Sequence, residues 1–126
     1  MSLSEYLAAL REEIARLDAF GFAESIDFHE ELRAGKQAIV KAEVKFVDGS
    51  TLVIREYIDA RYGIEKLSYA YHFQERDGKV IFRYDNAAHK PFLEFAGHKH
   101  TADGCIIQAL PPDMSDLLEE IIGYLG

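Results

Sequence analysis

The chain has 126 residues, of which 48% are hydrophobic and 29% are charged. That length and that balance are typical of one folded domain and argue against a disordered chain. The 14 Lys and Arg residues are outnumbered by 22 Asp and Glu, and the net charge of -8 disfavours nucleic acid or anionic membrane as a partner of the whole surface. A local basic patch is compatible with this composition.

An amphipathic helix is expected at each end of the chain. Ser2 and Glu5 have the spacing of a capping box, and apolar residues then recur every three or four positions until Gly21. Near the C-terminus, Pro111-Pro112 blocks helix formation, and Asp113 is a suitable N-cap for a second apolar stripe. We predict helices over about residues 2–20 and 114–125.

Between the helices the hydrophobic pattern changes to a period of two, which predicts strands. The expected strands cover about residues 24–33, 38–47, 51–59, 67–75, 79–85 and 105–109. Gly35, Asp48-Gly49 and Asp77-Gly78 separate successive strands, and such short turns favour antiparallel neighbours. The sequence therefore predicts one α+β domain over residues 1–126, with an antiparallel meander sheet of about five to six strands and both helices packed on one face.

The first hairpin turns around Asp48-Gly49, and its register follows from keeping apolar residues on one face. A three-residue loop, Asp48-Gly49-Ser50, places Phe46 opposite Leu52. It also places Glu43 opposite Arg55. We expect this register for the hairpin.

The second hairpin turns at Asp77-Gly78, where a two-residue loop pairs the aromatic side chains best. The aromatic pairs are Phe73 with Phe82 and Tyr71 with Tyr84. The opposite face then presents His72, Arg83 and Asp85 together, with cross-strand Cβ atoms roughly 4.5–5.5 Å apart. Such a trio can bind an anion or organise acid–base chemistry. The alternative is a solvated sheet face with cross-strand charge pairs.

Histidines and basic residues gather in the segment 61–100. This segment contains four of the five His residues, namely His72, His89, His98 and His100. The segment has seven Lys or Arg and five acidic residues, a net charge of +2, whereas the rest of the chain has seven and 17, a net charge of -10. This segment could therefore face phosphate even in an acidic protein.

The motif His98-Lys99-His100 places two imidazoles on one face if the backbone is extended. With His72 or His89, it could form a three-His site that leaves zinc an open position for water. Alternatively, the imidazoles are general acid and base for phosphodiester cleavage, while Arg83 or Lys99 holds the phosphate. A surface loop that happens to contain histidines is the third interpretation.

Several of these motifs together resemble the TumE family, whose members are small toxins of bacterial toxin–antitoxin pairs. The similarity covers about residues 24–122. It rests on the segments Lys66-Leu67-Ser68-Tyr69-Ala70-Tyr71-His72-Phe73-Gln74, Asp77-Gly78-Lys79, Ile81-Phe82-Arg83-Tyr84-Asp85-Asn86-Ala87 and His98-Lys99-His100. The ordered combination is far more specific than any one of its parts.

The resemblance marks a set of candidate functional positions. The candidate catalytic residues are His72, Arg83, Asp85, His89, His98 and His100, and the candidate binding residues are Tyr71, Tyr84, Asn86 and Lys99. Similar proteins carry a further His where this chain has Gly97, and Pro and His where it has Ala88 and Lys90. The loss of two imidazoles weakens a metal site more than a two-residue acid–base pair.

The function that we expect is a type II toxin that cleaves RNA without a metal, through a His/Arg/Asp face of the sheet. The resemblance implies a cognate antitoxin, expected to be a DNA-binding helix-turn-helix protein. The alternatives are a non-catalytic sheet domain that binds a ligand or zinc through His72, His98 and His100, or an interaction domain that docks a partner beside Arg55. A homodimer is compatible with the sequence.

The cellular location follows from what the sequence lacks. No apolar run has the length of a signal peptide or a membrane span. The single Cys105 excludes an intramolecular disulfide and a multi-Cys zinc site, which is typical of the reducing cytosol. We expect a soluble cytoplasmic protein with no membrane contact, in which Cys105 is a small buried apolar residue.

Overall fold

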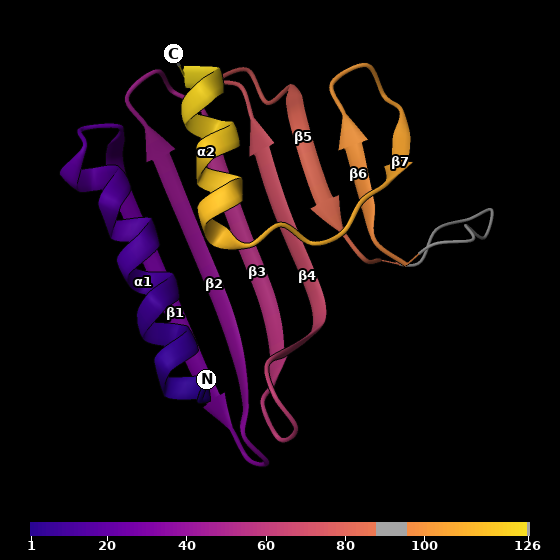
Figure 1. Ribbon diagram of the computed structural model, residues 1–126. Helices are drawn as coiled ribbons and strands as arrows, with labels where there is room; N and C mark the ends of the chain where they lie inside the picture. The colour runs from indigo at the N-terminus through magenta and orange to yellow at the C-terminus, as the bar shows by residue number, and fades with distance from the viewer. Residues whose placement is uncertain (88–95, 126) are drawn as a thin grey trace.

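A computed structural model describes residues 1–87 and 96–125 of the chain (Figure 1). Two helices flank seven strands. Helix α1 spans Leu3–Ala19, and the strands are β1 (Ala23–Arg33), β2 (Gln37–Phe46), β3 (Thr51–Asp59), β4 (Glu65–Gln74), β5 (Val80–Asp85), β6 (His98–Thr101) and β7 (Ile106–Gln108), followed by helix α2 (Met114–Leu125). The strands form one antiparallel sheet in sequence order. The predicted fold class is confirmed, with seven strands in place of five to six.

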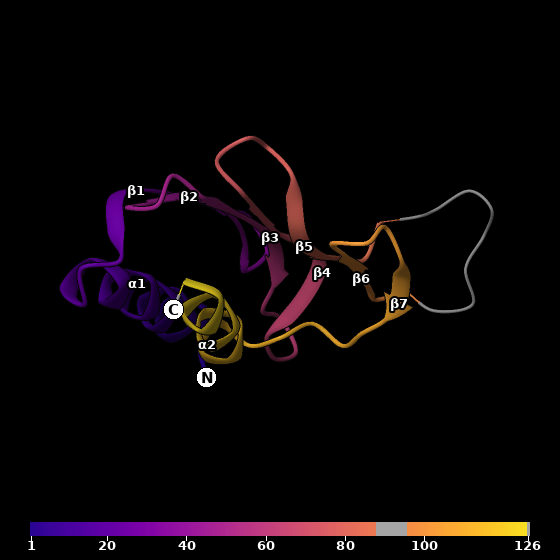
Figure 2. The ribbon, with the colours of Figure 1, turned by 90° about the horizontal axis from the view of Figure 1, so that it is seen from above.

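Both helices lie on the same side of the sheet, as Figure 2 shows. Helix α1 begins with the expected capping box, in which the Ser2 hydroxyl accepts a hydrogen bond from the Glu5 N–H and the Glu5 carboxylate accepts one from the Ser2 N–H. Its buried residues are Leu7, Leu10, Ile14 and Leu17. Of the described elements, none lies over the other face of the sheet, which we call the open face.

Helix α2 begins where the Asp113 carboxylate accepts a hydrogen bond from the Asp116 N–H at 2.8 Å. Its residues Leu117 and Ile121 are fully buried in the core between helices and sheet. Glu120 accepts hydrogen bonds from the Tyr84 hydroxyl at 2.6 Å and from Lys99 Nζ at 2.8 Å, which ties the helix to β5 and β6. No described helix combines the length and the apolar character needed to cross a membrane.

The register expected for the first hairpin is wrong by two residues. Val44 pairs with Leu52, so that Glu43 lies opposite Val53 and Arg55 lies opposite Lys41. The loop is formed by Val47, Asp48 and Gly49, because Phe46 bonds to Ser50 through its N–H. A shift of two leaves every side chain on its predicted face, so the hydrophobic pattern could not distinguish the two registers.

The register expected for the second hairpin is confirmed over its aromatic part. Phe73 pairs with Phe82, and on the open face His72 pairs with Arg83. An irregularity between Phe73 and Gln74 shifts the pairing at the tip, where Gln74 lies opposite Val80. The aromatic pairs point toward the helices, and Phe73 and Phe82 are almost completely buried.

Strand β6 was not predicted as a strand. The following hairpin returns as β7, and the Ala109 N–H then bonds to the Gly97 carbonyl at 3.2 Å. This approach is so close that a Cβ atom at position 97 would lie 2.4 Å from the Ala109 oxygen. Cys105, in the turn between the two strands, is exposed and not buried as expected. The turn is too short to reach the core.

Replacing Gly97 by Ala should destabilise the fold by roughly 1–3 kcal/mol, because backbone must move to admit the new methyl group. A matched control is Gly123→Ala in α2, where a Cβ would meet no atom within 4 Å. That substitution should stabilise the protein by about 0.5–1 kcal/mol through helix propensity. Denaturant unfolding of both variants measures the difference. Equal stabilities would contradict the close packing at Gly97.

Candidate functional site on the open face

The open face of β4, β5 and β6 carries one row of three polar side chains. His72 on β4 lies opposite Arg83 on β5, which lies opposite His100 on β6. Cross-strand partners point to the same side of a sheet, so the guanidinium lies between two imidazoles. The next row contains Asp85, opposite His98. The sheet thus assembles five of the six predicted catalytic residues, and the sixth, His89, lies outside the described residues.

Asp85 connects the two rows. Its side chain is only 4% exposed and accepts a hydrogen bond from Arg83 Nε at 2.9 Å. His100 Nε2 lies 3.2 Å from one carboxylate oxygen, and His98 Nδ1 lies 3.5 Å from the other. The Ala87 N–H also donates to Asp85 at 3.2 Å. One buried carboxylate therefore orients groups from β5 and β6.

The charge of Asp85 is stabilised despite its burial. Burial alone raises the pKa of a carboxyl group. The hydrogen bonds from Arg83 and the Ala87 N–H, together with the positive charges of His100 and Arg83, outweigh it, and the pKa of Asp85 is lowered from its ordinary value. Asp85 is therefore an anion at neutral pH and holds the Arg83 guanidinium in place.

Both ring nitrogens of His72 have protein partners. Nδ1 lies 3.3 Å from Arg83 Nη1, and Nε2 lies 3.0 Å from the Gln74 carboxamide oxygen. A guanidinium can only donate, so Nδ1 accepts and the proton is on Nε2, donated to Gln74. A ligand that draws Arg83 toward itself would leave Nδ1 available as a base.

The residues of the cluster differ in how far solvent reaches them. The Arg83 side chain is 38% exposed and the His100 side chain 25%, whereas the His98 side chain is 3% exposed. His72 is partly exposed and, with Arg83, lines a hollow of about 360 Å³. Solvent therefore reaches His72, Arg83 and His100, while His98 is buried against Asp85.

The predicted zinc alternative can be compared with the structure only for His72, His98 and His100, because His89 lies outside the described residues. Among the residues that the structure describes, no three His, Cys, Asp or Glu side chains are grouped so that they could hold a metal ion. His72 and His100 are separated by β5, about 10 Å at the usual strand spacing. The guanidinium of Arg83 occupies the position between them, and its permanent charge opposes a cation there.

Three of the predicted binding residues lie on the helix-covered face. Lys99 and Tyr84 contact Glu120 of α2, as described above. The Tyr71 hydroxyl donates to Glu56, and burial together with that carboxylate raises the pKa of Tyr71. Asn86 bonds to the backbone of the neighbouring strand, through the Tyr69 N–H and the Leu67 carbonyl. These four residues stabilise the fold, and their side chains do not face the row of His72, Arg83 and His100.

Two other features were not singled out from the sequence. The fully buried Glu56 side chain accepts hydrogen bonds from Tyr6 and Tyr71 and lies 3.4 Å from Lys66 Nζ. In the sequence, this cluster is indicated by Glu56, an acidic residue at a position of β3 that faces the core. On the open face, Arg55 lies opposite Lys41, a pairing hidden by the two-residue error in register.

Replacing Asp85 by Asn should lower the free energy of unfolding by about 1–3 kcal/mol at neutral pH, because charge-assisted hydrogen bonds are lost. The folded-state pKa of Asp85 is lowered, so its stabilising effect is present above the ordinary carboxyl value of 3.8 and is lost as pH falls through the lowered value. The difference in the free energy of unfolding between wild type and Asp85→Asn should therefore become smaller at acidic pH.

The matched control is Asp27→Asn on the same face, where Asp27 and His29 form an ion pair 2.8 Å long with side chains 72% and 74% exposed. We expect a change within about 0.5 kcal/mol there. Urea unfolding at several pH values measures both variants. Equal effects for Asp85→Asn and Asp27→Asn would contradict the central role of Asp85.

Comparison with known proteins adds one match. A family model described as Toxin TumE matches residues 11–125. Searches of the curated proteins and of the solved structures found no match. Gly97, by contrast with an open position, has no room for a side chain in this backbone, because a Cβ there would lie 2.4 Å from the Ala109 carbonyl oxygen. Because the family match covers all but the first ten residues and the last one, the chain belongs to the TumE toxin family.

Proposed function

We propose that this chain, as the toxin of a toxin–antitoxin pair, cleaves RNA with the row formed by His72, Arg83 and His100. The observation that supports this most is the row itself. Two imidazoles flank a guanidinium on three adjacent strands of the open face. A phosphate held by the guanidinium would have a proton-transfer group on either side.

The chemistry needs two proton transfers at one phosphodiester. His72 takes the proton of the ribose 2′-hydroxyl, and the resulting oxygen attacks the phosphorus. As that bond forms, the bond from phosphorus to the 5′-oxygen breaks, and His100 gives its proton to the leaving oxygen. Arg83 binds the phosphate and stabilises the negative charge on its oxygens. The products are a 2′,3′-cyclic phosphate and a 5′-hydroxyl.

The environment of each imidazole favours its role. His100 lies 3.2 Å from the Asp85 carboxylate, which holds its ring in place beside Arg83. Nδ1 of His72 accepts from Arg83, so a phosphate that engages Arg83 would release this nitrogen as a base. His98 is buried against Asp85 and acts as a positioning residue.

Single substitutions to Ala at His72, Arg83 and His100 should each lower the rate of RNA cleavage by about 10²–10⁴-fold. The same substitutions should relieve the growth arrest caused by induced expression of the wild type. His29→Ala, which removes an exposed imidazole on β1, should change neither result. Thermal unfolding must first show that every variant is folded.

Full cleavage by folded His72→Ala and His100→Ala would overturn the proposal. So would wild-type protein that arrests growth but leaves every cellular RNA intact. In that event, the open face would serve to bind a ligand or a partner.

We further propose that the reaction needs no metal, because general acid–base catalysis supplies both proton transfers and Arg83 supplies the positive charge. Cleavage should therefore persist at an unchanged rate after dialysis against EDTA. Loss of activity in EDTA, with recovery on adding zinc, would show that a metal takes part.

The toxin family implies an antitoxin partner. We propose that this antitoxin is a helix-turn-helix DNA-binding protein that acts with the toxin in the bacterial cytoplasm and covers the row on the open face. Copurification and a footprint of the complex by hydrogen exchange would test this, since protection should concentrate on β4, β5 and β6. Protection confined to the helices would contradict it.

A further inference from the structure

A second group of cations lies on the open face beside the row of His72, Arg83 and His100. Lys41 on β2 pairs with Arg55 on β3, and Arg55 pairs with Ala70 on β4. Ala70 in turn lies opposite Asp85. Because Ala70 has only a methyl group, no long side chain stands between Arg55 and the Arg83 cluster.

Among the described residues, Lys41 and Arg55 lack the carboxylate partners that Arg83 and Lys99, on neighbouring strands, possess. Arg83 is engaged by Asp85, and Lys99 is engaged by Glu120. Within residues 1–87 and 96–125, by contrast, no carboxylate forms an ion pair with Lys41 or with Arg55, and both residues are exposed. Their charges are available to an anion.

The surface around Arg55 is hollowed on three sides. One hollow of about 360 Å³ reaches from Arg55 to His72 and Arg83. A second, of about 290 Å³, is lined by Lys41, Arg55, Tyr57 and Arg83 among others. A third, of about 180 Å³, extends past Lys41 toward β1. Arg55 is common to all three, so they form adjoining parts of one surface.

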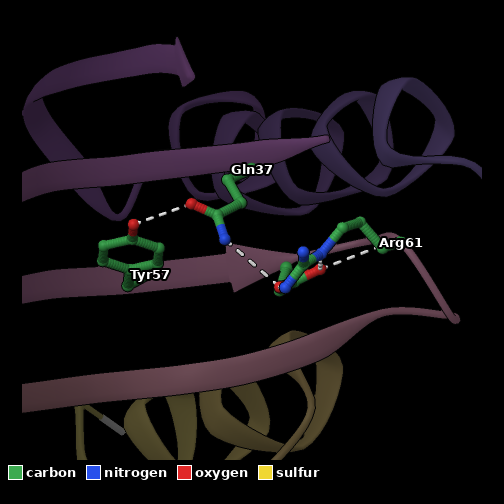
Figure 3. Close-up of polar contacts among 4 residues, drawn as sticks. Gln37, Tyr57 and Arg61 are labelled. Carbon is green, nitrogen blue, oxygen red and sulfur yellow. Dashed lines mark hydrogen bonds and ion pairs between the residues drawn. The ribbon is translucent and has the colours of Figure 1, made fainter. Parts of the chain in front are cut away.

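Tyr57 places an aromatic ring beside these cations, and its orientation is fixed. Its hydroxyl donates to the Gln37 side-chain oxygen at 2.8 Å, and the Gln37 amide donates to Asp59 at 3.2 Å (Figure 3). Arg61 then holds Asp59 through Nη2 at 2.9 Å, and its hydrogen bonds lower the pKa of Asp59 to about 2. A ring held in this way can serve as a rigid stacking platform.

We propose that single-stranded RNA lies across strands β2 to β5 of the open face, with its phosphates bound by Lys41 and Arg55 and a base stacked on Tyr57. The proposal rests on the proposed function and names how that site binds its substrate. Three strand spacings, roughly 14 Å, separate Lys41 from Arg83, so the path extends over more than one nucleotide. Phosphate-binding cations beside an aromatic ring are what sequence-tolerant binding of single strands requires.

Acidic side chains mark the end of this path. Asp27 and Glu31 on β1 and Glu43 on β2 share the open face. They would repel a phosphate backbone that continued beyond Lys41. The path therefore leads from β2 toward His72 and Arg83, and does not cross the whole sheet.

The test is binding of a fluorescein-labelled 2′-O-methyl RNA of about twelve nucleotides, which has no 2′-hydroxyl and so cannot be cleaved. Anisotropy at several salt concentrations compares wild type with Lys41→Gln/Arg55→Gln. The matched control is Arg16→Gln/Lys79→Gln, which makes the same charge change at exposed residues outside this surface. Tyr57→Leu and Tyr57→Phe test the ring.

Wild type and control should bind alike. The Lys41→Gln/Arg55→Gln variant should bind at least tenfold more weakly, and its slope of log affinity against log salt should fall by about 1.4, since each single-strand phosphate contact contributes about 0.7. Tyr57→Leu should weaken binding by about tenfold, whereas Tyr57→Phe, which keeps the ring, should retain most of it.

Two failures can be told apart. If the wild type binds and cleaves RNA but Lys41→Gln/Arg55→Gln behaves like the control, the path is wrong and the proposed function stands. If the wild type neither binds nor cleaves RNA, both are wrong. Thermal unfolding again excludes misfolding as the cause of weak binding.

Discussion

The buried carboxylate of Asp85 is the interaction on which the open face depends. It holds the Arg83 guanidinium at 2.9 Å and lies within 3.5 Å of nitrogens of His98 and His100. A buried anion of this kind is costly unless cations and N–H donors surround it, so its partners are held in a definite arrangement. Without Asp85, the side chains of Arg83, His98 and His100 would lose the partner that they share.

The two faces of the sheet differ in what they contact. One face is closed by α1 and α2, and the aromatic residues of β4 and β5 are buried there. Polar residues on that face, such as Glu120 and Glu56, connect the helices to the sheet. The other face carries His72, Arg83 and His100, and beside them Lys41, Arg55 and Tyr57. This division explains why the net charge of the whole chain says little about what one face can bind.

Most of the fold could be predicted from the period-two alternation of apolar and polar residues in the strands. This alternation assigned both faces and paired His72 with Arg83 correctly, because large aromatic residues at both ends of the second hairpin leave one favourable register. In the first hairpin, the apolar residues stay on the same face when one strand shifts by two positions. The pattern therefore predicts Glu43 opposite Arg55, where the structure has Lys41. The sequence does not predict strand β6, because His98-Lys99-His100 does not alternate between apolar and polar residues. The burial of His98 depends on contacts with Asp85 that no local pattern contains.

The central claim is that two imidazoles and one arginine carry out a transesterification on RNA. It is tested most directly by identifying the ends of the products after purified protein has acted on a defined single-stranded RNA, using mass spectrometry. The account predicts a 2′,3′-cyclic phosphate on one fragment and a 5′-hydroxyl on the other. Fragments with a 3′-hydroxyl and a 5′-phosphate, or an RNA left uncut by protein that arrests growth, would contradict it.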